Sequence, residues 1–392
     1  MATAIIDLDF ERLPEEITGL ERYHHALILI RLSEQPVGKA FISITDGKIA
    51  GNTLHEVLIE AAGWPLVERW LDDYLGWDEI WESNSMPERA TVAVCTRDRP
   101  DDLERCLESL RLLADIGHEI LVIDNCPTSE ATRTVVEGFE CFRYIREDKV
   151  GLNSARNRAL REAQHDIVAF TDDDAVPDPA WLGALLRNFN EPLVMCVTGL
   201  TMPSELETEA QEWFERYNPF SRGFRRTVYD NSYYHPIGAG RIGAGANMAL
   251  RRSVLEYVGF FDEALDAGTP THSGGDTEMF SRILSRGYRI VYEPAALNWH
   301  RHRRSWEELR RTIYGYGVGV YAFWTRSLLV EGELGVLRAA PVWFLRYQLR
   351  ALLRSLFRRP NSLPLDLLLA ELRGCLRGPF AYLTSRKLHA GA

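Results

Sequence analysis

The sequence predicts an α/β protein whose central sheet is mostly parallel and wrapped by helices, with a small N-terminal α+β addition and a helical C-terminal extension. Short apolar runs alternate with helical patterns between residues 90 and 176, as right-handed crossovers between parallel strands require. Polar residues follow each run, and such sheets bind ligands at the carboxyl ends of their strands. A chain of 392 residues can build one large core and one or two additions.

The central elements follow one another at short intervals. Asp101 and Asp102 are expected to cap a helix with a leucine face, and residues 151–157 open another helix. A helix with apolar residues Ile283 and Leu284 begins near 275. The predicted strands are 90–96, 119–125, 143–145, 166–170 and 289–292.

Residues 1–86 have a different pattern. Two strands are predicted at 26–32 and 40–44, with a turn at 35–38 between them. A leucine-rich helix follows and is expected to be interrupted at 63–65, and residues 82–87 have the composition of a linker. We expect a small accessory domain that serves acceptor binding, dimerisation or packing alone.

The acidic cluster Asp172-Asp173-Asp174 follows the apolar run at 166–170. In an extended chain Asp172 and Asp174 point to one side and Asp173 to the other. Two neighbouring carboxylates repel each other unless a proton or cation lies between them, and Mg²⁺ or Mn²⁺ suits such ligands. The alternative is a solvated acidic turn.

Further polar residues lie at the other strand ends. Thr96, Asp98 and Asp124 can hold a base and a ribose, because a buried base edge needs fixed hydrogen-bond partners. Helix capping or turn formation is the alternative for the two aspartates. Arg156 is predicted in the first turn of its helix, where a cation does not suit the helix dipole. We therefore expect Arg156 to face phosphate or base.

The order and spacing of these motifs resemble the family 2 glycosyltransferases, which have the GT-A nucleotide-sugar-binding fold, over about half the chain. The resemblance implies transfer of a sugar from a nucleoside diphosphate donor, with UDP favoured, to an acceptor hydroxyl with inversion at the anomeric carbon. The Gln-x-x-Arg-Trp motif of processive synthases is absent, so a single addition to a glycan, lipid-linked or small-molecule acceptor is expected, in glycan, glycolipid or polysaccharide synthesis. The matching segments are 92–100, 122–125, 151–157, 171–174, 243–248, 275–278 and the surroundings of His300.

The same resemblance implies roles for single residues. Asp276 is the catalytic base, although the family usually has Glu-Asp where this chain has Gly275-Asp276, and Glu278 is the weaker candidate that orients the acceptor. Asp174 is the first choice as metal ligand and Asp172 faces ribose and metal, with Asp173 as the outward partner. His300 completes the coordination, and His302 stays open as the alternative. The donor contacts are Thr96, Arg97, Asp98, Asp124, Asn153, Arg156, Asp172, Asp173 and Asn247.

The glycine-rich stretch 238–247 lacks the strand and helix context of a dinucleotide fingerprint. We expect a flexible segment beside the donor that offers Asn247 to the sugar. The catalytic domain is then expected at 90–325, with a donor half at 90–176 and an acceptor half at 177–325.

Residues 326–392 form the expected C-terminal extension. After His300 the chain has 16 lysines and arginines against 6 acidic residues, although the whole chain carries a net charge of −11. Arg346, Arg350, Arg354 and Arg358 recur every fourth residue among leucines, which predicts a basic amphipathic helix. Such a helix at 341–359 can lie on an anionic membrane where lipid-linked acceptors are found. The alternative is a helix that packs on the catalytic domain with solvated arginines.

Cysteine usage and hydropathy indicate a location. The six cysteines are scattered without Cys-x-x-Cys pairs, which favours a reducing compartment without a zinc site. Charged residues precede any apolar stretch long enough for a leader, and no apolar run reaches about 18 residues. We expect a cytoplasmic protein, or a peripheral one at the inner face of the cell membrane.

Three other classes of protein fit the sequence less well. A sugar nucleotidyltransferase also uses carboxylate-bound Mg²⁺, but it has a glycine-rich basic loop where this chain has Thr96-Arg97-Asp98. A non-catalytic nucleotide-sugar-binding protein would not need Asp276. The acidic chain has no nucleic-acid-binding motif, so nucleic acid is not expected as a partner, whereas a homo-oligomer is compatible with the sequence.

Overall fold

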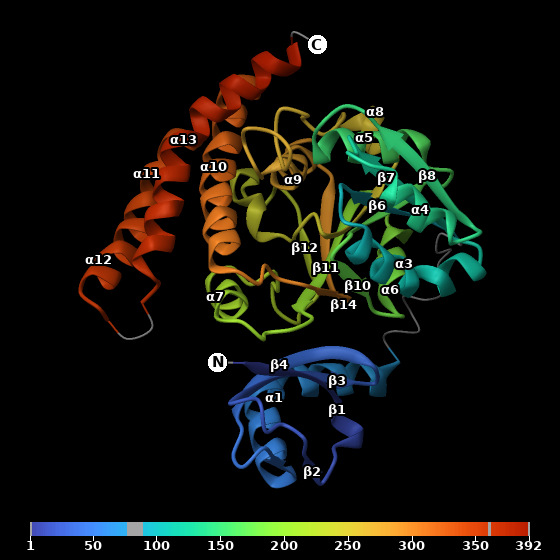
Figure 1. The fold of residues 1–392 in the computed structure, drawn as a ribbon, viewed down its shortest axis with the longest axis vertical. Coiled ribbons are helices and arrows are strands. Elements are labelled where there is room, and N and C mark those ends of the chain that lie inside the picture. The colour runs from blue at the N-terminus through green and yellow to red at the C-terminus, as the bar shows by residue number, and fades with distance from the viewer. Residues whose placement is uncertain (1, 77–88, 360–361, 391–392) are drawn as a thin grey trace.

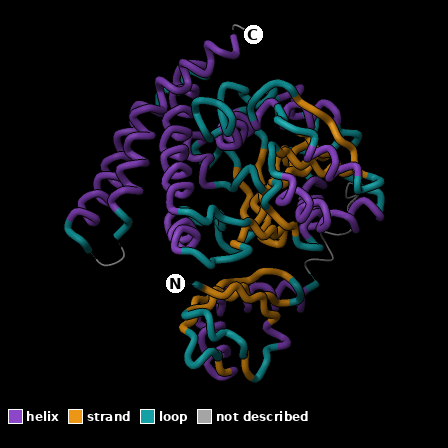
Figure 2. The backbone as a smooth tube through the Cα atoms, viewed as in Figure 1, coloured by secondary structure: helices purple, strands orange, loops and turns teal. Residues whose placement is uncertain are grey.

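A computed structural model describes residues 2–76, 89–359 and 362–390. Figure 1 shows an N-terminal unit beneath a central α/β part, with long C-terminal helices along one side. Figure 2 shows that strands are confined to the first two parts and that the end of the chain is helical. The predicted linker at 82–87 lies outside the described residues.

The central sheet confirms the predicted fold class. Its strand order is β10-β14-β11-β13-β9-β6-β7-β8, and β12 pairs with β14. Strands β6, β7, β8 and β9 run parallel, whereas β13 is antiparallel to β9 and to β11. The strands are β6 (Thr91–Thr96), β7 (Glu119–Asn125), β8 (Phe142–Glu147), β9 (Ile167–Asp172), β10 (Ala175–Pro177), β11 (Val194–Pro203), β12 (Thr227–Tyr229), β13 (Asn247–Arg251) and β14 (Arg289–His300).

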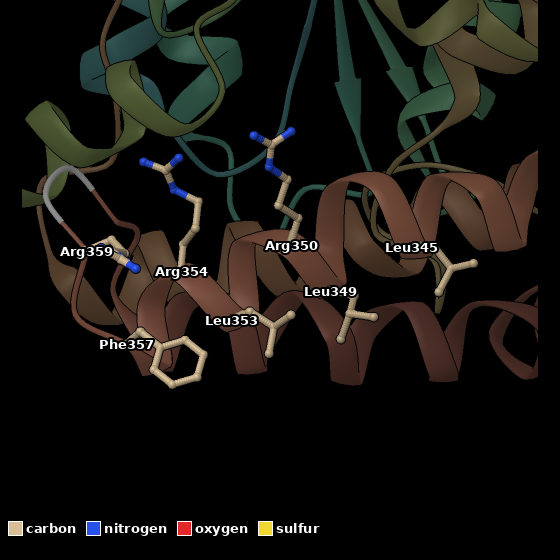
Figure 3. Close-up of a pocket in the computed structure, with 7 residues that line it drawn as sticks. All are labelled: Leu345, Leu349, Arg350, Leu353, Arg354, Phe357 and Arg359. Atoms are coloured by element: carbon tan, nitrogen blue, oxygen red, sulfur yellow. The ribbon is translucent and has the colours of Figure 1, made fainter.

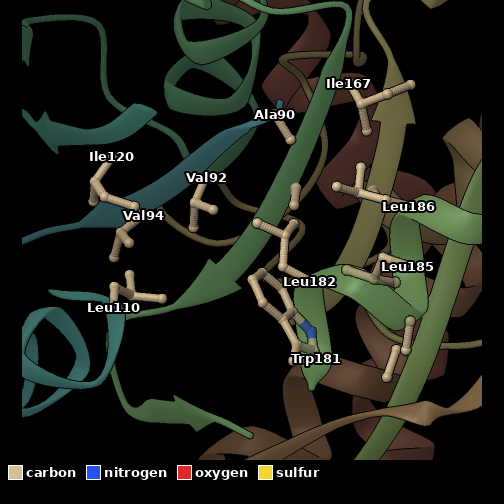
Figure 4. Close-up of a cluster of buried hydrophobic side chains, with 14 of the residues drawn as sticks. Ala90, Val92, Val94, Leu110, Ile120, Ile167, Trp181, Leu182, Leu185 and Leu186 are labelled. Atoms are coloured by element: carbon tan, nitrogen blue, oxygen red, sulfur yellow. The ribbon is translucent and has the colours of Figure 1, made fainter. Parts of the chain in front are cut away.

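Helices cover both faces of this sheet. Figure 4 shows one face, where Val92, Val94 and Ile120 of the sheet lie near Leu110 and Trp181 of the covering helices. That layer comprises α3 (Pro100–Asp115), α4 (Ala131–Glu137) and α6 (Trp181–Leu186). The opposite layer comprises α5 (Leu152–Glu162), α8 (Val254–Tyr257) and α9 (Gly275–Ser285). Helix α7 (Glu209–Tyr217) and the 3₁₀ helices η2 (Arg187–Asn190) and η3 (Pro236–Arg241) lie in the connections.

The N-terminal unit is a three-stranded sheet backed by one helix. Its strands β1 (Thr3–Asp9), β3 (His25–Leu32) and β4 (Gln35–Ser43) pair in the order β1-β3-β4, and α1 (Gly51–Leu75) covers one face. The other face packs on the central part through Leu27 and Leu29, which meet Leu200, Met202 and Leu297. Short elements η1 (Phe10–Arg12), β2 (Glu16–Ile17) and β5 (Ile49–Ala50) complete the unit.

Two local predictions for this unit are wrong. The turn lies at Ser33 and Glu34, both with positive φ, rather than at 35–38, because two such residues match the twist of a tight hairpin. Pro36 is therefore inside β4, where it is tolerated because β4 is an edge strand. Helix α1 also continues through Pro65, because its buried face, which includes Leu58, Ala62 and Leu66, packs on the sheet.

The predicted cap of α3 is also wrong. Arg99 occupies the N-cap and Pro100 the first helical position, which suits proline because its missing N–H has no partner there anyway. Asp101 and Asp102 lie inside the first turn, where their charge complements the helix dipole.

The C-terminal extension is a helical assembly on α10 (Trp306–Val330). Helix α13 (Leu365–Ala390) contacts α10 at glycines: a Cβ on Gly317 would collide with the carbonyl oxygen of Glu371, and one on Gly374 with that of Tyr314. The chain between them forms α11 (Val336–Trp343), a π-helical turn (Phe344–Leu349) and α12 (Arg350–Leu356). Arg358 therefore lies beyond the helix end, with φ of 47°, and not on the helix with the other three arginines. Among the described helices, none is long and apolar enough to cross a bilayer.

Candidate active site

The ends of three parallel strands bring polar residues to one edge of the sheet. In the register of the sheet, Thr96 on β6 lies beside Asp124 on β7, and Cys95 lies beside Asp172 on β9. This is the carboxyl edge, where α/β sheets bind ligands.

A candidate metal-binding group lies at the end of β9. One ligand atom each from Asp172, Asp174 and His300 lies within 4.8 Å of the other two. His300 reaches the group because it ends β14 and pairs with Ala175 of β10, directly after the acidic cluster. The imidazole that the structure brings to the two carboxylates is thus that of His300 rather than His302.

Three cationic or potentially cationic groups surround Asp174. His300 Nε2 lies 3.1 Å from Oδ1, while Arg99 and Arg303 lie 3.2 and 3.0 Å from Oδ2. Burial acts to raise the pKa of Asp174, but His300 and the two arginines outweigh it and hold the pKa below its ordinary value. The sequence offers Arg301, Arg303 and Arg304 either to screen a leaving diphosphate or as surface residues, and the structure brings Arg303 to Asp174. Arg99 was given no role from the sequence, and only its basic character in a polar segment signalled it.

The outward orientation predicted for Asp173 is wrong. Its side chain is buried, accepts a hydrogen bond from Thr96 Oγ1 at 2.7 Å and pairs with Arg99 at 3.1 Å. Strand β9 ends at Asp172, so the alternation of an extended chain no longer applies to Asp173. Burial and the charge of Asp174 raise the pKa of Asp173 to about 7. Thr96 is also turned toward this carboxylate.

The chemistry of the group fits a divalent cation. Two carboxylates and one imidazole form a donor set that Mn²⁺ accepts readily, and Mg²⁺ prefers the oxygens alone. The pKa of Asp172 is raised by burial and by the charge of Asp174, so a cation would relieve the repulsion between the two carboxylates.

Asp124 presents an unused acceptor at the same sheet edge. Its Oδ2 accepts a hydrogen bond from Tyr144 at 3.0 Å, whereas its Oδ1 is buried and has no partner among the described residues. Burial raises the pKa of Asp124. Such an acceptor can take a hydrogen bond from a ligand or from an ordered water molecule.

The neighbouring residues Asp98 and Arg97 are exposed. Asp98 has φ of 53° and accepts hydrogen bonds from the backbone N–H and hydroxyl of Thr128. This arrangement is the turn-forming alternative that was considered for Asp98.

Arg156 lies deeper than expected. Helix α5 begins at Leu152, so Arg156 is in the second turn and not in the first. Its guanidinium pairs with Asp266 at 2.7 Å and donates to Asn153 Oδ1 at 3.2 Å, and the Asn153 amide donates to the Asp262 carbonyl. The placement of Arg156 in the first turn is therefore wrong, and Asp266 is the anion that its buried cation needs, while a contact of Arg156 with phosphate or base stays a prediction.

Asp276 opens α9 next to the glycine-rich segment. Its Oδ2 accepts from the Gly245 N–H at 2.8 Å, and its Oδ1 accepts from the Thr277 N–H at 2.6 Å. A Cβ on Gly245 would collide with the Arg156 guanidinium, so glycine permits the close approach. Strand β13 places this segment beside the metal group, because Asn247 pairs with Thr171, the residue before Asp172, and Gly245 is two residues before Asn247. The candidate base and metal group therefore border a common region.

Three further expectations are wrong. The Asn247 side chain is fully occupied, since its amide donates to the Leu200 and Ala296 carbonyls and its oxygen accepts from Trp181, so it does not offer a group to a sugar. Glu278 is buried in ion pairs with Arg282 and Arg326, because it points into the core from α9. The stretch 238–247 is not a featureless flexible segment, since it includes part of η3 and the start of β13.

The central sheet and the helices on its two faces have the architecture of the GT-A fold. Residues 91–259 match the model of the family described as Glycosyl transferase family 2, so this part of the chain is a domain of that family.

Several known proteins are similar to this chain. The chain is 29% identical over 234 residues to the pre-mycofactocin glycosyltransferase of Mycobacterium tuberculosis (strain ATCC 25618 / H37Rv), which covers 57% of this chain and 46% of the relative. It is 25% identical to the probable glycosyltransferase YdaM of Bacillus subtilis (strain 168), over 48% of this chain and 44% of that protein. The chain thus spans about half the length of these curated relatives. Among solved structures, the mannosyltransferase PcManGT from Pyrobaculum calidifontis in complex with GDP-Man and Mn²⁺ gives a TM-score of 0.44 at 20% identity, over 84% of this chain and 83% of that one.

Proposed function

We propose that this protein is a metal-dependent, inverting glycosyltransferase that adds one sugar from a nucleoside diphosphate donor, with UDP favoured, to an acceptor hydroxyl. The single observation that supports the proposal most is that the group Asp172, Asp174 and His300 lies beside Asp276, which the Gly245 N–H holds next to the end of β9. One set of groups suits a diphosphate and its cation, and the other suits a hydroxyl that must lose a proton.

Each residue has a defined part in the proposed reaction. Asp172, Asp174 and His300 would hold Mn²⁺ or Mg²⁺, and such an ion would supply positive charge to a leaving diphosphate. Asp124 Oδ1 accepts a hydrogen bond from the base, which supplies the missing partner of that buried oxygen. Asp276 takes the proton of the acceptor hydroxyl while the hydroxyl oxygen forms a bond to the anomeric carbon. The bond between that carbon and the diphosphate oxygen breaks at the same time. Attack opposite the leaving group inverts the anomeric centre.

A thermal-shift screen tests this function. UDP-, GDP- and TDP-sugars are added with Mn²⁺, with Mg²⁺ or with EDTA. A donor at 100 times its Kd should stabilise the fold by about 2.7 kcal/mol, and only when metal is present. Stabilisation by a nucleoside triphosphate and a sugar phosphate, with diphosphate release, would instead favour the nucleotidyltransferase alternative. Binding of a donor without transfer to any of a panel of acceptors would favour a non-catalytic binding protein.

We further propose that the C-terminal helices hold the protein at an anionic membrane that carries a lipid-linked acceptor. Figure 3 shows Leu345, Leu349, Leu353 and Phe357 in one row, with Arg350 and Arg354 directed to the other side of the helix. Leu345, Leu353 and Phe357 are 58%, 45% and 71% exposed, which is unusual for side chains of this size on a helix that only packs. An apolar row beside arginines is the composition of a helix that lies in the bilayer interface.

Vesicle co-sedimentation tests the membrane proposal. Changing Arg346, Arg350, Arg354 and Arg358 to Gln should reduce partitioning to anionic vesicles, since each arginine near the surface contributes about 1 kcal/mol, and high salt should do the same to the wild type. A control with Arg105, Arg111, Arg133 and Arg311 changed to Gln has the same net charge but keeps the C-terminal helices. Equal partitioning of both variants would contradict a specific role for these helices.

A further inference from the structure

A chain of four polar side chains leads from the candidate metal group to the N-terminal unit. His300 Nδ1 lies 3.1 Å from His302 Nδ1, and His302 Nε2 lies 3.4 Å from Glu215 Oε2. Glu215 Oε1 accepts a hydrogen bond from Lys39 Nζ at 2.8 Å. Lys39 belongs to β4 and Glu215 to α7, and Figure 1 shows these two elements facing each other across the boundary between the N-terminal unit and the central part.

When a metal is bound, the hydrogen bonds between these four side chains can all form in only one donor-to-acceptor direction. A metal ligand at His300 Nε2 needs that nitrogen without a proton, so His300 carries its proton on Nδ1 and donates it to His302 Nδ1. His302 then carries its proton on Nε2 and donates to Glu215, a carboxylate that can only accept. Lys39, which can only donate, holds the other oxygen of Glu215.

The surroundings fix these side chains in place. The His302 side chain is almost fully buried, its ring centroid lies 4.3 Å from that of Phe214, and Phe220 meets His300 edge-on at 5.2 Å. Lys39 is held in turn by β4, whose sheet packs on the central part through Leu27 and Leu29. Lys39, which lies outside the catalytic domain, therefore sets the direction in which these hydrogen bonds run.

We infer that Lys39 of the N-terminal unit, acting through Glu215 and His302, is a positioning residue that fixes the proton of His300 on Nδ1 and so keeps its Nε2 ready for a metal. The inference rests on the proposed metal site. It gives residues 1–76 a function toward the active site beyond packing, although none of them belongs to the metal group.

Because these hydrogen bonds run in one direction, the variant Glu215→Gln tests the inference. In this variant Lys39 still requires an oxygen, so the amide oxygen turns to Lys39 and the amide NH₂ faces His302. His302 must then accept at Nε2 and donate from Nδ1, which leaves the proton of His300 on Nε2 where it blocks the metal. Loss of such a supporting contact typically costs about tenfold to a hundredfold in metal affinity.

The second variant, Lys39→Met, separates this role from a structural one. Alone it should weaken Mn²⁺ binding a few-fold. Combined with Glu215→Gln it should restore much of the lost affinity, because the amide is then free to turn its oxygen to His302. If the two substitutions acted only by damaging the structure, the double variant would bind Mn²⁺ as weakly as Glu215→Gln or more weakly. The readout is Mn²⁺ binding by electron paramagnetic resonance on the full chain without donor, together with the thermal stability of each metal-free variant.

Matched controls exist in the same elements. Glu212→Gln changes the neighbouring glutamate of α7, which accepts from Thr3, and Lys48→Met removes an exposed pair with Glu16 in the same N-terminal unit. Neither should change Mn²⁺ affinity. If the wild type binds no Mn²⁺, the proposed metal-dependent function fails. If the wild type binds Mn²⁺ and Glu215→Gln binds it equally, or if the double variant is no better than Glu215→Gln, the positioning role is overturned.

Discussion

The two sides of the site hold their key carboxylates in opposite ways. Asp174 is in contact with His300, Arg99 and Arg303. Asp276 is held by the backbone N–H groups of Gly245 and Thr277, and among the described residues no lysine or arginine pairs with it. Cations stabilise an ionised carboxylate, as a metal ligand requires, whereas the two backbone donors fix the direction in which the Asp276 carboxylate points. The difference distinguishes the proposed binding side of the site, around Asp174, from its proposed reacting side, around Asp276.

The first prediction concerns the loss of metal-dependent donor binding when Asp174 is changed. Asp174→Asn removes one metal ligand and the anion that pairs with His300, Arg99 and Arg303. We expect metal-dependent donor affinity to fall by about a hundredfold or more, because loss of a ligand should cost at least as much as loss of a residue that only supports one. Calorimetry with the donor, with and without EDTA, measures the change. Unchanged affinity in the variant and in EDTA would show that the metal is bound elsewhere or not needed.

The second prediction breaks the reacting side alone. Asp276→Asn keeps the size of the side chain and an oxygen that can accept from Gly245. Transfer should fall by roughly a hundredfold, the scale of general-base catalysis, while donor affinity stays within a few-fold. Single-turnover assays and donor calorimetry on the same preparation separate the two effects. Normal turnover would move the base to another residue, and Glu278 is a poor successor because it is buried in ion pairs.

The third prediction concerns the pH dependence of base binding at Asp124 and has the smallest expected effect. Burial raises the pKa of Asp124, so its carboxylate takes up a proton at a higher pH than an ordinary aspartate, whose pKa is about 3.9. If the ionised form accepts from the base, affinity is complete above the raised pKa and falls as the pH drops through it. Uridine titrations between pH 4 and 7 measure this without the metal, and Asp124→Asn should bind several-fold more weakly but without that acid limb. A wild-type affinity constant across the range would exclude Asp124 as a contact of the base.

The sequence predicted the architecture better than the side-chain contacts. Apolar runs locate β6, β7 and β9 to within a residue or two, because each is a buried strand bounded by polar residues. The group of Asp172, Asp174 and His300 was likewise foreseeable, since strand ends and the family motif both point to it. The division of the chain at residues 86 and 326 stays a prediction.

The failures have a common physical cause. Asn247, Glu278 and Arg156 look available in the sequence, but each is engaged by partners distant in the chain: Leu200 and Ala296, Arg326, and Asp266. Local patterns carry no information on such long-range pairs. The same limit explains why Arg99 was missed as a partner of Asp173 and Asp174, and why the chain from His300 to Lys39 was not foreseen.

The glycine contacts between α10 and α13 have a mechanical consequence for the base. The α10 helix also supports the residues before Asp276, because Ser273 Oγ donates to the Gly315 carbonyl at 3.0 Å and a Cβ on Gly274 would lie 2.9 Å from the Gly319 carbonyl oxygen. One side of α10 thus touches the start of α9 and another touches α13, both at backbone contact. A side chain at position 317 or 374 would wedge α10 away from α13, and with no slack on the other side the displacement would reach Asp276. The outermost helices of the molecule therefore help to determine how accurately Asp276, the proposed base, is placed.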